Sequence, residues 1–216
     1  MALGLNTESG GGDYADIVKY DARAGRMFRV DRSQDGGGQW QTNNVEITQG
    51  FQAVFDLDNI EVGWSLFASG VAPSFVMVPL GQPLPARPSD QHKQGFRVMV
   101  KLGKSSGGDV RELASVAKVV IGGLDGLHTE FLAQRAKNPG KLPVVALSGV
   151  TAVVTTGKGQ SSTNYAPVFE IKSWVDRPAE FDGQTAAASP PAQAPAQQPA
   201  KAAPAAAPAM ADAEEF

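Results

Sequence analysis

The stretch that decides the fold spans residues 45–67 and reads VEITQGFQAVFDLDNIEVGWSLF. Apolar side chains fall at alternate positions through its first half, the period of a strand with one buried face; they are Val45, Ile47, Phe51, Ala53, Phe55 and Leu57. A turn follows at Asp58-Asn59. We therefore expect a strand over 45–57 and a partner strand over 60–67.

Working outward, the same period predicts further strands before and after one helical segment. Residues 75–80 form a short apolar run, and in 96–102 the apolar side chains Phe96, Val98, Val100 and Leu102 share one face. Apolar spacing then changes to that of a helix over 110–131, although glycines allow a break near 122–124. Two strands are expected after it, over 142–156 and 165–175.

This order predicts a mainly β, α+β domain with one helical segment. A five-stranded barrel of the OB-fold type, with its helix between strands 3 and 4, fits the order, and such barrels bind single strands across one face. Many other α+β domains would read the same way. We expect a flexible N-terminal arm over 1–13, one domain over 14–182 and a disordered tail over 183–216.

Composition limits the chemistry that the chain can perform. Its 216 residues, 42% of them hydrophobic, suffice for one core. There is no cysteine, which excludes disulfides, thiolate catalysis and cysteine-bound zinc. With only His92 and His128, we expect no metal site and no cofactor. No segment resembles a leader or a membrane helix, so a cytoplasmic protein without a membrane partner is expected.

The last part of the chain differs from the rest in composition. Residues 183–216 are almost entirely Ala, Pro and Gln, and such a segment cannot bury enough apolar surface to offset its ordering entropy. Its net charge is −2, which leaves −1 for residues 1–182 out of the −3 of the whole chain. The segment closes on an acidic tip that is made of Asp212, Ala213, Glu214, Glu215 and Phe216.

This tail resembles that of the bacterial and bacteriophage single-stranded-DNA-binding proteins, in which a barrel is followed by a flexible linker and an acidic tip ending in phenylalanine. The chain lacks the proline that precedes the terminal phenylalanine in the bacterial pattern. The resemblance implies protection of single-stranded DNA in replication or recombination, in a host cytoplasm if the protein is phage-encoded. It also implies that replication or repair proteins bind Asp212, Glu214, Glu215 and Phe216. It does not predict the oligomeric state.

Sequence-tolerant binding of single strands needs cations for the phosphates and aromatic faces on which bases stack. Basic side chains are interleaved with aromatic ones over residues 19–32, and other candidates lie in a glycine-rich loop or on the polar side of expected strands. Trp64 is expected in the core. The candidate DNA-binding residues are Lys19, Tyr20, Arg23, Arg26, Arg29, Arg32, Trp40, Phe67, Arg97, Lys101, Lys172 and Trp174. Taken singly, each is better explained as a partly buried aromatic or a solvated charge, and only their joint placement on one face would indicate a DNA site.

Catalytic motifs are not convincing, and we do not expect an enzyme. Gly103-Lys104-Ser105 is similar to the end of a phosphate-binding loop, but Val98 stands where the first glycine is needed. Asp56 and Asp58 are typical of a turn and have no evident third ligand. A structural or adaptor protein, whose barrel binds protein and whose tail is a tether, remains the alternative to DNA binding.

Overall fold

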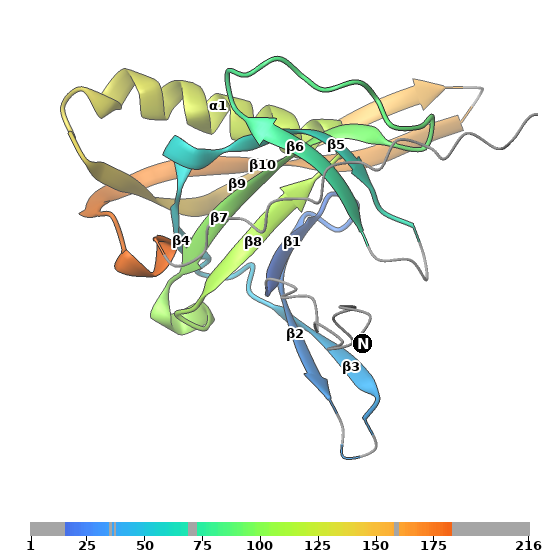
Figure 1. Cartoon of the computed structure of the whole chain (residues 1–216), viewed down its shortest axis with the longest axis horizontal. Coiled ribbons are helices and arrows are strands. Elements are labelled where there is room, and N and C mark those ends of the chain that lie inside the picture. The colour runs from blue at the N-terminus through green and yellow to red at the C-terminus, as the bar shows by residue number, and fades with distance from the viewer. Residues whose placement is uncertain (1–15, 35, 37, 69–72, 158–159, 183–216) are drawn as a thin grey trace, which may run out of the picture.

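The computed structural model describes residues 16–34, 36, 38–68, 73–157 and 160–182 (Figure 1). The expected arm over 1–13 and the expected tail over 183–216 lie outside these residues. So do the four predicted partner-binding residues, Asp212, Glu214, Glu215 and Phe216.

One mixed sheet forms the body of the protein, in the order β10-β9-β4-β7-β8-β1-β2-β3, and β5 pairs with both β7 and β6. The sheet is antiparallel except that β1 runs parallel to β8. The strands are β1 (Ile17–Asp21), β2 (Arg26–Gln34), β3 (Trp40–Glu46), β4 (Gln52–Phe55), β5 (Glu61–Leu66), β6 (Ser74–Pro79), β7 (Lys93–Leu102), β8 (Val110–Ser115), β9 (Lys141–Gly157) and β10 (Gln160–Asp176). The α-helix α1 (Lys118–Arg135) connects β8 to β9.

The expected five-stranded OB-type barrel is therefore wrong, because the sheet has ten strands and the helix follows the eighth. Residues 17–46 form three strands that the apolar pattern did not predict. Polar side chains occupy both faces of β3, so no period of two is visible there, yet the backbone ladder to β2 forms all the same. The mainly β character with one α-helix, in the described residues, agrees with the prediction.

The expected helix over 110–131 is also wrong at its start. Residues Val110–Ser115 form β8, between β7 and β1, and Arg111, Glu112 and Leu113 are buried in succession. A strand covered on both faces loses its alternation and can imitate helical spacing. The helix begins at Lys118 and continues without a break through Gly123, where a Cβ would lie 2.8 Å from Pro167 of β10.

The strand expected over 45–57 is interrupted at residues 47–51, so that it contributes the end of β3 and all of β4. The sheet turns a corner directly after β4. Both β4 and β5 pair with the same edge of β7, and Leu57–Asn59 form a 3₁₀ turn between them. From this corner, β4 passes to β9 and β5 passes to β6. Two strand pairs thus diverge from one central strand (Figure 1).

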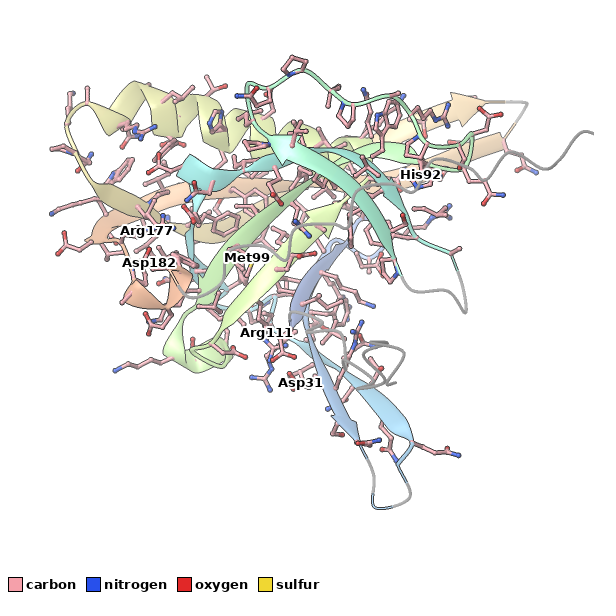
Figure 2. All side chains as sticks on the ribbon, viewed as in Figure 1. Asp31, His92, Met99, Arg111, Arg177 and Asp182 are labelled. Carbon is pink, nitrogen blue, oxygen red and sulfur yellow. The ribbon has the colours of Figure 1, made fainter. Side chains whose placement is uncertain are left out.

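An ion pair between a buried carboxylate and a half-buried guanidinium holds the corner in place. Asp56 is 3% exposed, and its two carboxylate oxygens accept hydrogen bonds from the Nη1 and Nη2 atoms of Arg177 at 2.7 and 2.8 Å. The side-chain amide of Asn59 donates to the same carboxylate. These hydrogen bonds raise the pKa of Arg177 above its ordinary value. Arg177 also pairs with Asp182, so the segment after β10 is fastened to the corner (Figure 2).

The core lies between the helix and one face of the sheet. Helix α1 buries Val120, Leu124, Leu127 and Phe131, which fall on one side of the helix. They pack in one cluster with buried residues of the strands, among them Phe55, Phe96 and Val98. The alternation predicted for 96–102 is confirmed, because Phe96, Val98, Val100 and Leu102 are all buried.

The sheet curls until strands near its two ends meet. The N–H of Tyr165 on β10 donates to the carbonyl of Ala22, which follows β1, at 2.7 Å. The hydroxyl of Tyr20 donates to the carbonyl of Tyr165 at 3.0 Å. Gly25 closes the turn between β1 and β2 with φ +67°, and a Cβ there would lie 3.1 Å from Tyr165. These contacts fix the position of the β1–β2 hairpin relative to β10.

We predict that Arg177→Met lowers the free energy of unfolding by about 3–5 kcal/mol, because the buried Asp56 carboxylate would lose its counter-ion. The double variant Asp56→Leu/Arg177→Met should recover much of this loss. Arg26→Met is the matched control, since it breaks an exposed pair with Glu46 and should cost less than about 1 kcal/mol. Urea unfolding of the four proteins measures these differences, and equal losses for Arg177→Met and Arg26→Met would contradict the prediction.

Candidate nucleic-acid interface

The face of the sheet that points away from the core runs across β7, β8, β1 and β2. Val18 and Tyr20 of β1 point into the core, so Ile17 and Lys19 point outward. On β7 the buried Val98 and Val100 alternate with Met99 and Lys101. The cross-strand pairs connect these positions, because residues paired across a ladder lie on the same face. We call this side the outer face; it carries Ile17, Lys19, Arg26, Phe28, Arg32, Arg97, Met99, Lys101, Glu112 and Ala114.

The pair Lys19–Phe28 is the clearest meeting of a cation and an aromatic ring on the outer face. The two residues are cross-strand partners, and the Lys19 Nζ lies 5.6 Å from the centroid of the Phe28 ring. Lys19 is exposed and Phe28 is half-buried. A lysine over a ring face is a favourable contact, and it holds a cation next to a surface on which a base can stack.

Further basic side chains surround this pair. Arg26 lies at the start of β2 and forms an exposed ion pair with Glu46 at 2.9 Å. Arg32 lies on the same face of β2 and is exposed. Arg23 stands in the β1–β2 turn, where the Asp21 carboxylate accepts hydrogen bonds from the N–H groups of Arg23 and Ala24. Basic groups therefore follow β2 from the turn that precedes it, which is held against β10, toward the β2–β3 hairpin that projects in Figure 1.

A second aromatic group lies on the β5–β6 hairpin. Phe67 directly follows β5, is 48% exposed and contacts Phe75 of β6 edge to face, with 5.6 Å between the ring centroids. The guanidinium of Arg97 lies 5.6 Å from the Phe75 centroid. The outer face thus carries aromatic rings on both sides of β7 and β8.

Arg97 is an internal partner for acids as well as a neighbour of these rings. It is 8% exposed, and it pairs with Glu61 of β5 at 2.6 Å and with Glu112 of β8 at 3.6 Å. Burial raises the pKa of Glu112, an effect that outweighs the lowering by Arg97. Arg97 therefore ties three strands together at the floor of the outer face.

Other predicted residues have structural partners away from this face. Tyr20 is buried, and burial raises its pKa to about 12. Arg29 pairs with Asp31 and donates to the carbonyl of Ser106, on the core side of the sheet. Asp31 also pairs with the buried Arg111 (Figure 2). These pairs close the end of the core.

The remaining predicted residues are divided between the outer face and other parts of the structure. Lys101 is on the outer face and pairs with Glu180. Lys172 of β10 pairs with Glu170, and Trp174 stacks on Phe131 of α1 with 5.6 Å between centroids, at the edge of the core. Trp40 begins β3 opposite Gln34; its side chain is outside the described part of the structure.

The structure also identifies residues that the sequence did not single out as binding candidates. Phe28 and Phe75 complete the aromatic groups, and Glu61 and Glu112 compensate Arg97. Lys19 and Phe28 are nine positions apart, so only the β1–β2 register brings them together. Trp64, expected in the core, is half-buried; it donates to the carbonyl of Pro85 and lies under Arg87.

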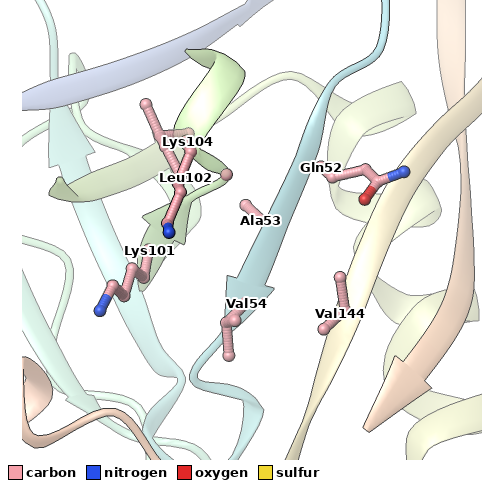
Figure 3. A pocket seen from close by; sticks show the side chains of 8 residues that line it. Gln52, Ala53, Val54, Lys101, Leu102, Lys104 and Val144 are labelled. Atoms are coloured by element: carbon pink, nitrogen blue, oxygen red, sulfur yellow. The ribbon is translucent and has the colours of Figure 1, made fainter. Parts of the chain in front are cut away.

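Two pockets are formed by the strands next to the corner and by the loop after β7. One of about 180 Å³ is lined by β4, β7, β9 and the loop that follows β7, with Lys101 and Lys104 on one side and Gln52 and Val144 on the other (Figure 3). It is smaller than typical ligand sites. The other, of about 420 Å³, adjoins the corner and contains the Asp56–Arg177 and Glu61–Arg97 pairs. The charged groups of these two pairs already form ion pairs with each other.

Comparison with known proteins found no matching family model, no matching curated protein and no matching solved structure. The described residues contain no helix long and apolar enough to cross a membrane. In the same part of the chain, no three acidic, histidine or cysteine side chains are grouped as a metal site requires.

We predict that Glu112→Gln makes stability less dependent on pH. Because burial raises the pKa of Glu112 in the folded protein, the unfolded chain releases this proton first as pH rises. The contribution of Glu112 to stability is therefore greatest below the pKa of the unfolded chain, and it is lost as pH rises through the folded value. Thermal unfolding measures this loss over a range of pH that begins at about 4, near the ordinary pKa of glutamate, and ends at about 8.

Glu46→Gln is the matched control, since Glu46 is an exposed glutamate in an ion pair on the neighbouring hairpin. The control should keep the pH dependence of the wild-type protein. A Glu112→Gln protein with the wild-type pH profile would contradict the assignment.

Proposed function

We propose that this protein binds single-stranded DNA, without reading its sequence, across the outer face. The observation that carries the proposal is the pairing of an exposed cation with an aromatic ring at Lys19 and Phe28, with Arg26, Arg32 and Arg23 on the same hairpin. Single-strand binding needs this combination of phosphate contacts and stacking surfaces.

The two aromatic groups give the proposed path a direction. Phe28 lies on β2, and Phe67 and Phe75 lie on the β5–β6 hairpin, with β1, β8 and β7 between them. A strand that stacks on both groups crosses the outer face over Met99 and Ala114. Arg97 lies beneath this path, where its ion pairs with Glu61 and Glu112 compensate its positive charge.

Charge supports single strands over duplex as the ligand. The net charge of residues 1–182 is −1, so a long duplex would meet little overall attraction. Stacking on aromatic rings requires unpaired bases, which duplex does not expose. The affinity should fall with salt, with a log–log slope of about −0.7 for each phosphate that is neutralised.

Recruitment of replication or repair proteins is the second part of the proposal, and it rests on sequence alone. Phe216 can fill an apolar pocket while Asp212, Glu214 and Glu215 meet a ring of basic side chains. A Phe216→Ala variant, compared with Met210→Ala, should lose capture of such partners and keep its affinity for oligo(dT). Pull-down and anisotropy measurements distinguish the two effects, and an equal loss of capture by both variants would exclude a specific role for Phe216.

We predict that Phe28→Leu weakens oligo(dT) binding by about 1–3 kcal/mol, the contribution of one stacked base. Leucine keeps apolar packing at this half-buried site but has no π face. Lys19→Ala should make the salt dependence shallower by about 0.7, the slope for one phosphate. Fluorescence anisotropy of labelled oligo(dT) at several salt concentrations measures both effects, with duplex of equal length as competitor.

Two variants on α1 serve as matched controls. Leu132→Ala removes an apolar side chain that is 53% exposed, and Lys118→Ala removes an exposed lysine. Both should bind oligo(dT) as the wild-type protein does. Unchanged melting temperatures for all four variants establish that each is folded. If Phe28→Leu and Lys19→Ala bind normally, or if no variant binds DNA at low salt, the outer face is not a DNA site, and the adaptor alternative is favoured.

A further inference from the structure

The strand residues in the distal half of the β9–β10 ribbon are largely exposed and uncharged, and Lys158 lies in the sequence between the two strands. Residues 142–157 and 160–169 contain no acidic or basic side chain. Val150 and Val154 of β9 are 43% and 62% exposed, although both are β-branched apolar residues. The ribbon projects beyond the end of α1 in Figure 1. Exposed strands in soluble proteins usually carry charges that prevent pairing with other chains.

The two edges of this ribbon differ. On β10, the N–H of Tyr165 is already donated to the carbonyl of Ala22, and Pro167, two positions further along the same edge, has no N–H to donate. The outer edge of β10 is therefore protected. On β9, the pairing with β4 involves Val144–Ala146 and ends in a hydrogen bond from Leu147 to Phe51.

Beyond that point the edge of β9 has no partner strand among the described residues. Ser148 is left unpaired by a bulge, and no described strand pairs with the edge over residues 149–155. Ala152 is the partner of Tyr165, whose N–H points away from β9, so this pair is of the non-hydrogen-bonded type. The backbone N–H and C=O groups of Ala152 must then point away from β10, in the plane of the sheet. The same holds for those of Val150 and Val154.

We propose that β9 of one copy pairs antiparallel with β9 of a second copy along residues 149–155, with a two-fold axis at Ala152. The register is set by the outward backbone groups, which must face each other across the axis. Ala152 then lies opposite its own copy, Val150 lies opposite Val154, and Thr151 lies opposite Val153. β-branched pairs of this kind stabilise a ladder.

Charge and shape favour a second copy as the occupant. In a two-fold interface each side chain near the axis meets residues of its own segment, and like charges there would repel. The ribbon has no such charge, and its smallest central side chain, Ala152, lies where the copies meet. An uncharged edge also gives a charged partner nothing to recognise. The proposal does not depend on DNA binding.

The test measures self-association of the full chain without nucleic acid, by sedimentation over a range of concentrations. The wild-type protein should form a dimer whose fraction rises with concentration. Val150→Lys/Val154→Lys places two lysine pairs across the axis and should weaken association by about tenfold or more. Val150→Lys/Val154→Glu changes the same positions but places opposite charges across the axis, so it should retain the dimer.

Two further variants complete the design. Leu132→Lys adds a charge at an exposed apolar site on α1 and should leave the dimer intact. Ala152→Pro removes an outward N–H without affecting the pairing to β10, and it should abolish the dimer while the protein stays folded. A monomer at every concentration, or a dimer that survives Val150→Lys/Val154→Lys, would overturn the proposal. Loss of the dimer in both lysine-containing double variants would overturn the two-fold register.

Discussion

The Asp56–Arg177 ion pair is the constraint on which the rest of the structure depends. It stands at the corner where β4 ends and β5 begins, and both strands share one edge of β7. From this corner β4 leads to the β9–β10 ribbon, and β5 leads to the hairpin that carries Phe75. A carboxylate that is 3% exposed requires its partner, so the segment after β10 cannot leave the corner without a large cost.

Buried and exposed cations of the sheet have different roles. Arg97, Arg111 and Arg177 are paired with acids in or near the interior, where they fix the positions of strands. Lys19 is exposed beside an aromatic ring, and that contact leaves its ammonium group open to a phosphate. The difference follows from the number of donors, since a guanidinium can satisfy several acceptors at once. The outer face is therefore a rigid floor of paired charges with a basic, aromatic hairpin at its side.

The strand edges show a similar division. The curl of the sheet occupies the edge of β10 through Ala22, and Pro167 blocks it further. The edge of β9 has neither device over 149–155, and Val150 and Val154 stand exposed on it. The outer face and this edge lie on different parts of the sheet, so the proposed DNA path and the proposed pairing of copies do not compete for the same residues.

The sequence by itself determined the mainly β class, the single α-helix, and the strands in which one buried face alternates with one exposed face. The strands β5, β6, β7, β9 and β10 lie close to their predicted ranges for this reason. It also drew attention to the basic segment over 19–32, part of which forms the outer face. It could not predict β2, β3 and β8, where polar residues on both faces, or burial on both faces, remove the period of two. It also missed β1, which alternates but is only five residues long.

Only the tertiary structure decided which of the basic and aromatic residues can act together. Lys19 and Phe28 meet because of a cross-strand register, whereas Trp174 stacks on Phe131 because α1 crosses β10. Arg97 and Arg29 read as surface cations in the sequence, but strands distant in the chain bring acids to them. Alternation along one strand shows which face a side chain occupies. The partner that lies on that face is set by the pairing of strands, which a single sequence does not specify.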